Sequence, residues 1–267
     1  MAKLTKAEVK EHARACDLLE KDSLTVDERE FVIRHWQESA RHTNSSAGAF
    51  FTPLDMAWSF AIEVGCRRIL DLCAGIGVLS YAIHQRSLWD ATRPVEITCV
   101  EVNPDYVAVG RKVLPEATWI VADALSDLDI GRFDCVVSNP PFGNIQGRGN
   151  FDLAVVEQAE RYADMGVFIL PAGSVPWAYS GRPCFESDSR SEVARRFRDR
   201  TQIHLEPGCG IDCSTWAKDW RGVAPKVEIA VADYDDARAR RDALKAPPAA
   251  KPAVVAVAQI DLFGRAT

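Results

Sequence analysis

The sequence lacks any apolar stretch of the roughly 18–20 residues that a membrane-spanning helix needs. Residues 1–22 are densely charged and contain no apolar signal-like core, so we expect a cytoplasmic protein that is not secreted. No Cys-x-x-Cys pair occurs among the eight cysteines. Cys73, Cys99 and Cys135 lie in or just after apolar runs, where cysteine packs as a small apolar residue. Reduced thiols are therefore the simplest expectation.

Positive charge is not in excess, because 32 Lys and Arg face 38 Asp and Glu, which gives a net charge of −6. A nucleic-acid partner would have to be attracted by a local basic cluster, since the field of the whole molecule does not help. Hydrophobic residues make up 47% and charged residues 26%, which is typical of a globular protein and excludes global disorder. A chain of 267 residues allows one large domain, or one domain with extensions.

Short apolar runs alternate with helical segments through the middle of the chain. The predicted strands cover 68–72, 96–100, 118–121, 133–137, 166–170, 201–205 and 226–232. The predicted helices cover 54–64, 77–86, 104–113 and 151–163. This alternation is typical of an α/β fold with a mostly parallel sheet and helices on both faces.

The flanking segments have their own signals. Residues 5–42 are expected to form two helices, because Thr5 with Glu8 and Thr25 with Glu28 are capping boxes. Thr52 is the expected N-cap of the helix at 54–64, with Pro53 in its first turn. The predicted organisation is an N-terminal helical extension (1–47), a main domain (48–232) with insertions at about 172–224, a charged segment with an Ala/Pro linker (233–258) and a C-terminal peptide (259–267).

Three predicted strands end in residues suited to binding a nucleoside. Asp71-Leu72-Cys73-Ala74-Gly75-Ile76-Gly77 follows the first strand, where glycines allow close backbone approach to a ligand and the next helix offers free N–H groups. Glu101, followed by Val102, ends the second strand, where a carboxylate can accept from two ribose hydroxyls. Asp123 ends the third and can accept from an adenine amino group. Each could alone be structural, as a tight turn or a solvated carboxylate, but all three belong to the ligand-binding edge of the sheet.

Asn139-Pro140-Pro141-Phe142 ends the fourth strand. Two prolines stiffen the backbone and remove two N–H donors, which leaves the Asn139 side-chain oxygen and the Pro140 carbonyl as fixed acceptors. An aromatic ring follows at Phe142. Two acceptors beside an aromatic plate suit a planar aromatic amine, whereas the alternative is a stiff loop with a packed phenylalanine.

In these features the chain resembles the class I S-adenosylmethionine-dependent methyltransferases that methylate N6 of adenine, over roughly residues 48–232. The resemblance rests on Gly48-Ala49-Phe50-Phe51-Thr52-Pro53, then the glycine turn, then Asn139-Pro140-Pro141-Phe142, in that order. It implies a seven-stranded sheet and catalysis by Asn139, Pro140, Pro141 and Phe142. The implied cofactor contacts are Phe51, Thr52 and Pro53, with Asp71, Cys73, Gly75 and Gly77 around the methionine portion, Glu101 and Val102 at the ribose, Asp123 at the adenine, and Asn139.

The resemblance favours DNA as the substrate, with the target base flipped out of the duplex. An RNA N6-adenine methyltransferase would carry the same tetrapeptide and stays a rival. A degenerate protein that binds nucleic acid without catalysis is a second rival, and the intact motifs speak against it. A separate DNA-recognition domain has no room in the chain, so sequence selectivity would come from the insertions or the N-terminal helices.

Other chemistry-bearing residues carry weaker signals. Cys184, His204, Cys209 and Cys213 fit no strong zinc spacing, so we expect no metal. Six arginines in 181–200 could follow a phosphate backbone, or could equally form a solvated helix face. The aromatic residues nearby are expected mainly to pack in the core, with base contact as the alternative; they are Trp177, Tyr179, Trp216 and Trp220.

The last residues contain Gln259-Ile260-Asp261-Leu262-Phe263, which resembles the peptide by which bacterial replication and repair proteins dock on the DNA sliding clamp. Leu262 and Phe263 would fill an apolar pocket and Gln259 would bond at its rim. Packing of this apolar pair on its own domain is the alternative. The Ala/Pro linker at 246–258 favours docking, because it lets the peptide reach away from the enzyme.

Overall fold

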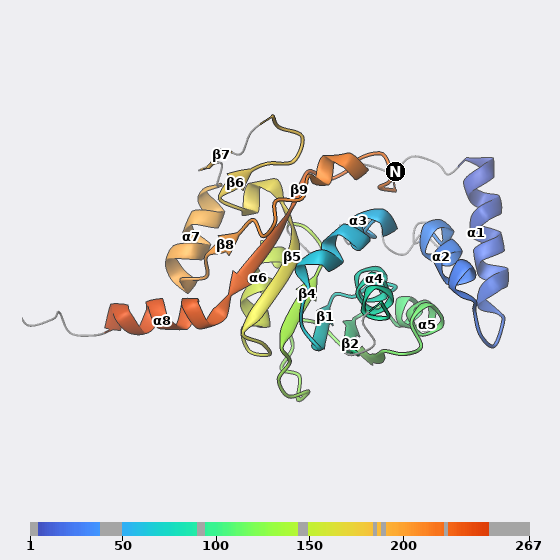
Figure 1. The fold of residues 1–267 in the computed structure, drawn as a ribbon, viewed down its shortest axis with the longest axis horizontal. Helices are drawn as coiled ribbons and strands as arrows, with labels where there is room; N and C mark the ends of the chain where they lie inside the picture. Colours follow the sequence, from blue (N-terminus) through green and yellow to red (C-terminus); the bar gives the residue numbers. More distant parts are fainter. Residues whose placement is uncertain are drawn as a thin grey trace, which may run out of the picture.

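The computed structural model describes residues 5–37, 50–89, 94–143, 149–183, 186–187, 191–221 and 224–245. A sheet of seven strands in the order β3-β2-β1-β4-β5-β9-β8 forms its centre (Figure 1). These strands are β1 (Arg68–Leu72), β2 (Glu96–Glu101), β3 (Thr118–Val121), β4 (Cys135–Ser138), β5 (Met165–Pro171), β8 (Leu205–Glu206) and β9 (Val227–Asp233). β9 pairs antiparallel with both neighbours, and the other strands run in one direction. The predicted mostly parallel, seven-stranded α/β sheet is therefore confirmed.

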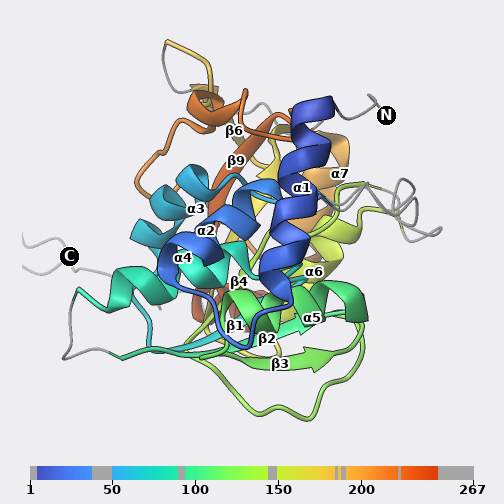
Figure 2. The same ribbon diagram turned by 90° about the vertical axis from the view of Figure 1, so that its right-hand side faces the viewer.

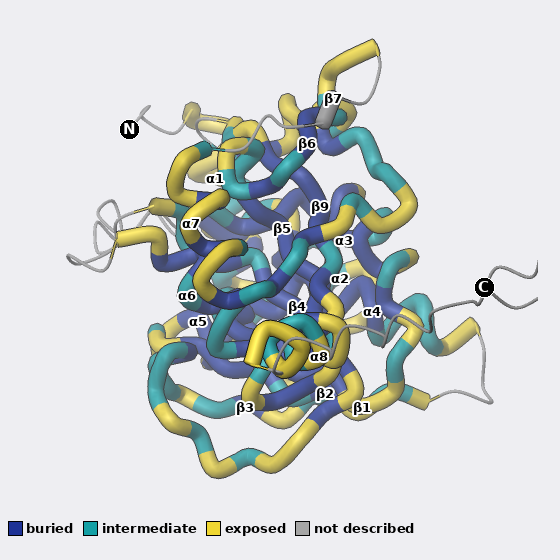
Figure 3. Tube along the Cα trace, turned by 90° about the vertical axis from the view of Figure 1, so that its left-hand side faces the viewer, coloured by how far each residue is buried: buried dark blue, intermediate teal, exposed yellow. Residues whose placement is uncertain are grey.

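Helices cover both faces of the sheet (Figure 1). One face carries α3 (Leu54–Phe60), α4 (Val78–Ser87) and α5 (Pro104–Val113), and the other carries α6 (Phe151–Ala159), α7 (Glu192–Thr201) and α8 (Tyr234–Lys245). Alternate residues of each strand point to opposite faces, so Ile69 of β1 packs in one apolar core and Leu70 in the other. The strands are accordingly buried between two helical layers (Figure 3).

The N-terminal extension forms α1 (Lys6–Leu19) and α2 (Val26–His35), and both predicted capping boxes are present. The two helices lie over the face that carries α3 and α5 (Figure 2). Ion pairs fasten α2 there, from Arg29 to Glu116 (2.9 Å) and from Arg34 to Asp55 (2.8 Å). Trp36, directly after α2, is buried in the same core.

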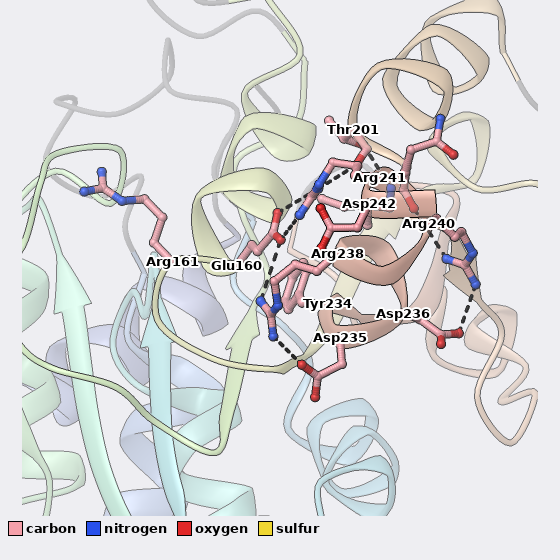
Figure 4. A network of polar contacts seen from close by, with 12 residues as sticks. Glu160, Arg161, Thr201, Tyr234, Asp235, Asp236, Arg238, Arg240, Arg241 and Asp242 are labelled. Carbon is pink, nitrogen blue, oxygen red and sulfur yellow. Dashed lines mark hydrogen bonds and ion pairs between the residues drawn. The ribbon is translucent and has the colours of Figure 1, made fainter. Parts of the chain in front are cut away.

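The C-terminal helix α8 is held against α6 by a network of charged groups (Figure 4). Glu160 at the end of α6 accepts hydrogen bonds from Arg241 and forms an ion pair with Arg238. The Tyr234 hydroxyl, at the buried start of α8, donates to the Val156 carbonyl (2.7 Å). Because the Tyr234 amide also donates to the Asp164 carbonyl just before β5, α8 begins at the N-terminal edge of the sheet.

Three expectations about local structure were wrong. Thr52 is not the N-cap of α3, because Pro53 occupies that position and the Thr52 hydroxyl binds Asn139 instead. Residues 201–205 are not a strand, because α7 continues to Thr201, Gln202 turns the chain with φ +58° and only β8 follows. The helix predicted at 54–64 is α-helical only to Phe60, and a 3₁₀ turn at Ala61–Glu63 completes it.

Short elements in the insertions complete the described structure. They are β6 (Trp177–Ala178), paired with β7 (Glu186–Ser187), and 3₁₀ turns at Ala172–Ser174 and Cys213–Trp216. Across the described ranges, none of the helices has the length and apolar character needed to cross a membrane.

Candidate active site

The turn between β1 and α4 brings backbone N–H groups to the C-terminal edge of the sheet. Cys73, Gly75 and Gly77 all adopt left-handed backbone angles, with φ of +60°, +57° and +84°. Such an angle is unusual at a residue other than glycine and is typical of functional turns. The Ala74 amide donates to the Val100 carbonyl of β2 (3.0 Å), which fixes the turn against the neighbouring strand.

Packing is a second reason for glycine at positions 75 and 77. A Cβ atom on Gly75 would lie 3.1 Å from the Phe51 ring, and one on Gly77 would lie 2.9 Å from the Trp119 ring. A side chain at either position would push these rings and strain the backbone. The residues Phe51 and Gly75, which the resemblance implied as cofactor contacts, therefore touch each other across the site.

Asp71 is almost fully buried under this turn. Its Oδ2 accepts from the Ser80 hydroxyl of α4 (2.6 Å), whereas its Oδ1 is enclosed and has no hydrogen-bond partner among the described residues. Burial raises the pKa of Asp71 to about 7, because the charged form is poorly solvated there. Asp71 also lines the pocket described below, so its free oxygen is an acceptor that a bound cation could use.

The raised pKa of Asp71 predicts how its contribution to stability depends on pH. The folded protein binds the Asp71 proton between about pH 4 and 7, where the unfolded chain has lost it, so the stability from this group is lost as pH rises through that range. Asp71→Asn removes the titration and leaves an acceptor for Ser80. We expect wild type to lose roughly 2–4 kcal/mol relative to this variant between pH 4.5 and 8. Urea unfolding of both proteins at the two pH values measures their free energies of unfolding. If wild type and Asp71→Asn differ by the same amount at both pH values, the prediction is wrong.

Glu101 ends β2 beside the glycine turn and is buried. One carboxylate oxygen accepts from the Gly75 amide (2.9 Å) and the other from the Asn103 amide (2.9 Å). Burial raises the pKa of Glu101 and the backbone N–H groups lower it. Glu101 therefore joins the glycine turn to the β2 edge and fixes both segments beside the pocket.

Asn139, directly after β4, is held by a segment far away in the sequence. Its Nδ2 donates to the Phe50 carbonyl (2.9 Å) and to the Thr52 hydroxyl oxygen (2.9 Å). Its Oδ1 is enclosed and has no hydrogen-bond partner in the described chain. A carbonyl can only accept, so the nitrogen must face Phe50 and the oxygen must face away. An unpaired buried acceptor costs about 1–3 kcal/mol, which a ligand that donates a hydrogen bond would recover.

Aromatic rings pack on Phe50, whose backbone carbonyl binds this amide. The ring of Phe142 lies 6.1 Å from that of Phe50, which in turn lies edge-on 6.4 Å from that of Trp220. Phe142 is half-buried and Trp220 is buried. The tetrapeptide is anchored at its start by the Ser138 hydroxyl, which donates to the Leu72 carbonyl of β1. Phe142 thus packs on Phe50, whose carbonyl accepts from Asn139, and the stacking of Phe142 on a base stays a prediction.

Two adjoining pockets bring most of the predicted residues together. The larger, of about 520 Å³ including solvent at its mouth, is within the range of small-ligand sites. Its walls are Phe50, Phe51, Cys73, Gly75, Glu101, Val102, Asn103, Tyr106, Asn139 and Pro141. The smaller pocket adds Thr52 and Asp71. Asp123 follows β3, where its carboxylate accepts from the Leu125 amide (2.9 Å), and its contact with a cofactor adenine stays a prediction.

Two residues that pack on Phe51 beside the site were not predicted from the sequence. Tyr106 lines the larger pocket and packs edge-on against Phe51 (5.1 Å). The Arg221 guanidinium lies over the Phe51 ring (5.6 Å) and donates to the carbonyls of Ile33 and Trp36. Tyr106 could have been noticed because it lies in the first turn of α5, shortly after Glu101 and the β2 edge, but nothing in the sequence links Arg221 to α2.

The insertion residues mostly have structural roles in the described chain. Arg196, Arg198 and Arg200 of α7 are ion-paired with Glu192, Asp199 and Glu157. These pairs favour a solvated helix face over a phosphate-binding surface. Trp177 and Trp220 are buried, as expected for core packing. In the described ranges no group of three metal-ligating side chains gathers, and Cys184 lies outside them.

The chain is similar to known methyltransferases. Residues 58–168 match the family model of the methyltransferase small domain. The ribosomal RNA large subunit methyltransferase G of Aeromonas salmonicida is 26% identical over 144 residues, which are 49% of this chain and 35% of that protein. The tRNA1(Val) (adenine(37)-N6)-methyltransferase of Tolumonas auensis is 26% identical over 83 residues, 29% of this chain and 33% of that one. The chain thus spans about a third of the length of these relatives.

A solved structure from Listeria monocytogenes, assigned to the class I S-adenosylmethionine-dependent methyltransferases, matches with a TM-score of 0.58 and 15% identity. The match covers 80% of this chain and 69% of that one, so the likeness extends beyond residues 58–168. The chain therefore has the class I methyltransferase fold, and residues 58–168 within it match the methyltransferase small domain.

Proposed function

We propose that this protein transfers the methyl group of S-adenosylmethionine to N6 of adenine in DNA. The observation that carries the proposal is the enclosed Asn139 Oδ1, an acceptor without a partner in the described chain, three residues before Phe142. An exocyclic amine has two hydrogens to donate, and Asn139 Oδ1 with the Pro140 carbonyl can accept both. Phe142 offers a ring on which the base can stack, worth about 1–3 kcal/mol.

The pocket fits S-adenosylmethionine in its chemistry. The free Oδ1 of Asp71 is suited to the ammonium of the methionine portion, and Glu101 is suited to the ribose hydroxyls. The exposed side chain of Val102 lies in the pocket wall, where it can pack on a nucleobase. Phe51, Thr52, Pro53, Cys73, Gly75 and Gly77 would enclose the methionine portion, and Asp123 would accept from the cofactor adenine.

The cofactor, when bound, supplies a methyl group on a sulfonium, which is already activated for transfer. The protein therefore needs no nucleophile of its own and acts by positioning and electrostatics. Asn139 and the Pro140 carbonyl hold the amine and increase electron density on its nitrogen, because they accept hydrogen bonds that strengthen as positive charge develops there. Since Asn139 Oδ1 is enclosed, the side chains that line the pocket must move when the base enters.

RNA is the second candidate substrate, because the relatives described above are named as ribosomal and transfer RNA methyltransferases. DNA is favoured by the clamp-like peptide at residues 259–263. A direct comparison decides between them. The full-length protein is incubated with labelled S-adenosylmethionine and either DNA or RNA of matched sequence, and the product nucleosides are identified by mass spectrometry.

We expect N6-methyldeoxyadenosine from DNA and at least tenfold less label in RNA. Label mainly in RNA would replace DNA by RNA as the substrate. Methylation of a base other than adenine, or of no nucleic acid, would refute the proposal. Long-read sequencing of DNA from cells that express the protein then gives the target motif.

We further propose that residues 259–263 dock on the bacterial sliding clamp; Gln259, Leu262 and Phe263 lie outside the described residues. The last described element before this peptide is α8, which begins at the sheet edge opposite the pocket. Tethering to a clamp on DNA raises the local substrate concentration without new contacts between enzyme and DNA. This would offset the unfavourable net charge of −6.

Calorimetric titration tests the docking. A peptide of residues 256–267 and the full-length protein are each expected to bind the clamp, whereas Leu262→Ala with Phe263→Ala abolishes binding. Methylation of short oligonucleotides, which carry no clamp, should be unchanged in the double variant. Full-length protein that fails to bind the clamp would refute the idea.

A further inference from the structure

The amide of Asn139 has two possible orientations, and only one presents an oxygen to the target amine. The Phe50 carbonyl selects it, because a carbonyl can only accept a hydrogen bond, and the Thr52 hydroxyl, which can accept or donate, adds a second acceptor in the selected orientation. Both hydrogens of Nδ2 are used, one by the Phe50 carbonyl and one by the Thr52 hydroxyl oxygen, each at 2.9 Å. In the opposite orientation two oxygens would face each other at Phe50, and the nitrogen would point into the site. The Asn139 nitrogen would then present hydrogen-bond donors to the target amine, which is itself a donor, so no hydrogen bond could form.

The segment that supplies these acceptors is well fixed. Thr52 is 6% exposed and Phe51 is 8% exposed, and the Phe51 ring is covered by the Arg221 guanidinium. The Phe50 ring packs between those of Phe142 and Trp220. Because Thr52 leaves the N-cap position of α3 to Pro53, its hydroxyl oxygen is free to accept from Asn139.

We infer that Thr52 is a positioning residue that, with the Phe50 carbonyl, locks the Asn139 amide so that its oxygen faces the target amine. This inference rests on the proposed function. It adds a specificity role, because a locked oxygen accepts only from a base that carries an amino group and disfavours a purine without one. The Phe50 acceptor belongs to the backbone and cannot be removed by mutation, so Thr52 is the part of the lock that can be tested.

Thr52→Val keeps the shape of the side chain and removes the acceptor, and Thr52→Ser keeps the acceptor and serves as the matched variant. At saturating S-adenosylmethionine we expect kcat of Thr52→Val to fall roughly 3–10-fold, as for one lost hydrogen bond. Thr52→Ser should stay within about twofold of wild type. A loss in Thr52→Val that disappears at saturating S-adenosylmethionine would overturn the inference, because Thr52 would then act only on cofactor affinity.

A second measurement tests the orientation of the Asn139 amide by comparing the affinity for two target bases. Wild type should bind an oligonucleotide with adenine at the mapped target more tightly than the same oligonucleotide with unsubstituted purine there. Thr52→Val should reduce this preference at least twofold, and Thr52→Ser should keep it. An unchanged preference in Thr52→Val would count against the lock.

A third measurement needs neither substrate nor cofactor. In full-length protein labelled with ¹⁵N-asparagine, the Asn139 side-chain resonances are identified by their absence in Asn139→Ala. Both amide hydrogens should exchange slowly in wild type, and exchange should accelerate in Thr52→Val but not in Thr52→Ser. Identical exchange in all three proteins would refute the lock, whereas the proposed function fails separately if wild type methylates no adenine.

Discussion

Asn139→Ala is expected to lower methylation by roughly 10²–10³-fold, the effect of removing a preorganised group that acts mainly in the transition state. The reason is the enclosed Oδ1, which has no partner in the described chain and belongs to a side chain that lines the pocket. Affinity for S-adenosylmethionine should change little, since Asp71 and Glu101 remain. Single-turnover assays at saturating cofactor measure the methylation rate, and calorimetric titration measures the affinity for S-adenosylmethionine.

Folding must be monitored in this variant, because Asn139 also bridges to Phe50 and Thr52. Denaturant unfolding of Asn139→Ala should show a loss of about 1–3 kcal/mol from these bonds. Turnover of Asn139→Ala at the wild-type rate would show that Asn139 is not a catalytic residue. Equal losses of cofactor affinity and turnover would instead place Asn139 mainly in cofactor binding.

Glu101→Ala is expected to weaken S-adenosylmethionine binding by about 10²–10⁴-fold. Two charge-assisted hydrogen bonds to the ribose, of roughly 1.5–3 kcal/mol each, would be lost. The structure adds a second cause, because the Gly75 and Asn103 amides would lose the acceptors that hold them at 2.9 Å. Calorimetric titration with S-adenosylmethionine measures the affinity.

Glu101→Gln separates these two causes. Glutamine keeps one oxygen, which can accept from only one of the two amides, while its NH₂ group faces the other amide. We expect an intermediate loss of affinity in this variant. If Glu101→Ala binds the cofactor as tightly as wild type does, the carboxylate serves only to fix the turn.

Elements with strong local signals were predicted well because the signals and the structure have the same physical origin. The helix at 104–113 matches its predicted bounds, since Asn103 caps it and proline occupies its first position. The strand at 68–72 matches because a short apolar run between two helical segments can be buried only inside a sheet. The placement of Asp71 and Glu101 at one edge follows, because parallel strands end on the same side.

The error at 201–205 has a tertiary cause. Thr201 is compatible with strand or helix by its sequence context, but its hydroxyl donates to the Phe197 carbonyl and its own carbonyl accepts from Arg241 of α8. These contacts belong to the end of a helix, and they depend on α8 being packed nearby. A local pattern could not supply them.

The sequence by itself determined that Asn139 would stand at the end of β4 between a stiff backbone and an aromatic ring, because strand, prolines and Phe142 are neighbours in the chain. Which of its two amide atoms would face the site was decided only by the tertiary structure. The deciding carbonyl belongs to Phe50, 89 residues away, and is brought to Asn139 by the packing of α3, α2 and the Trp220–Arg221 segment. Hydrogen-bond partners so distant in sequence are set by the fold as a whole, because no local propensity encodes them.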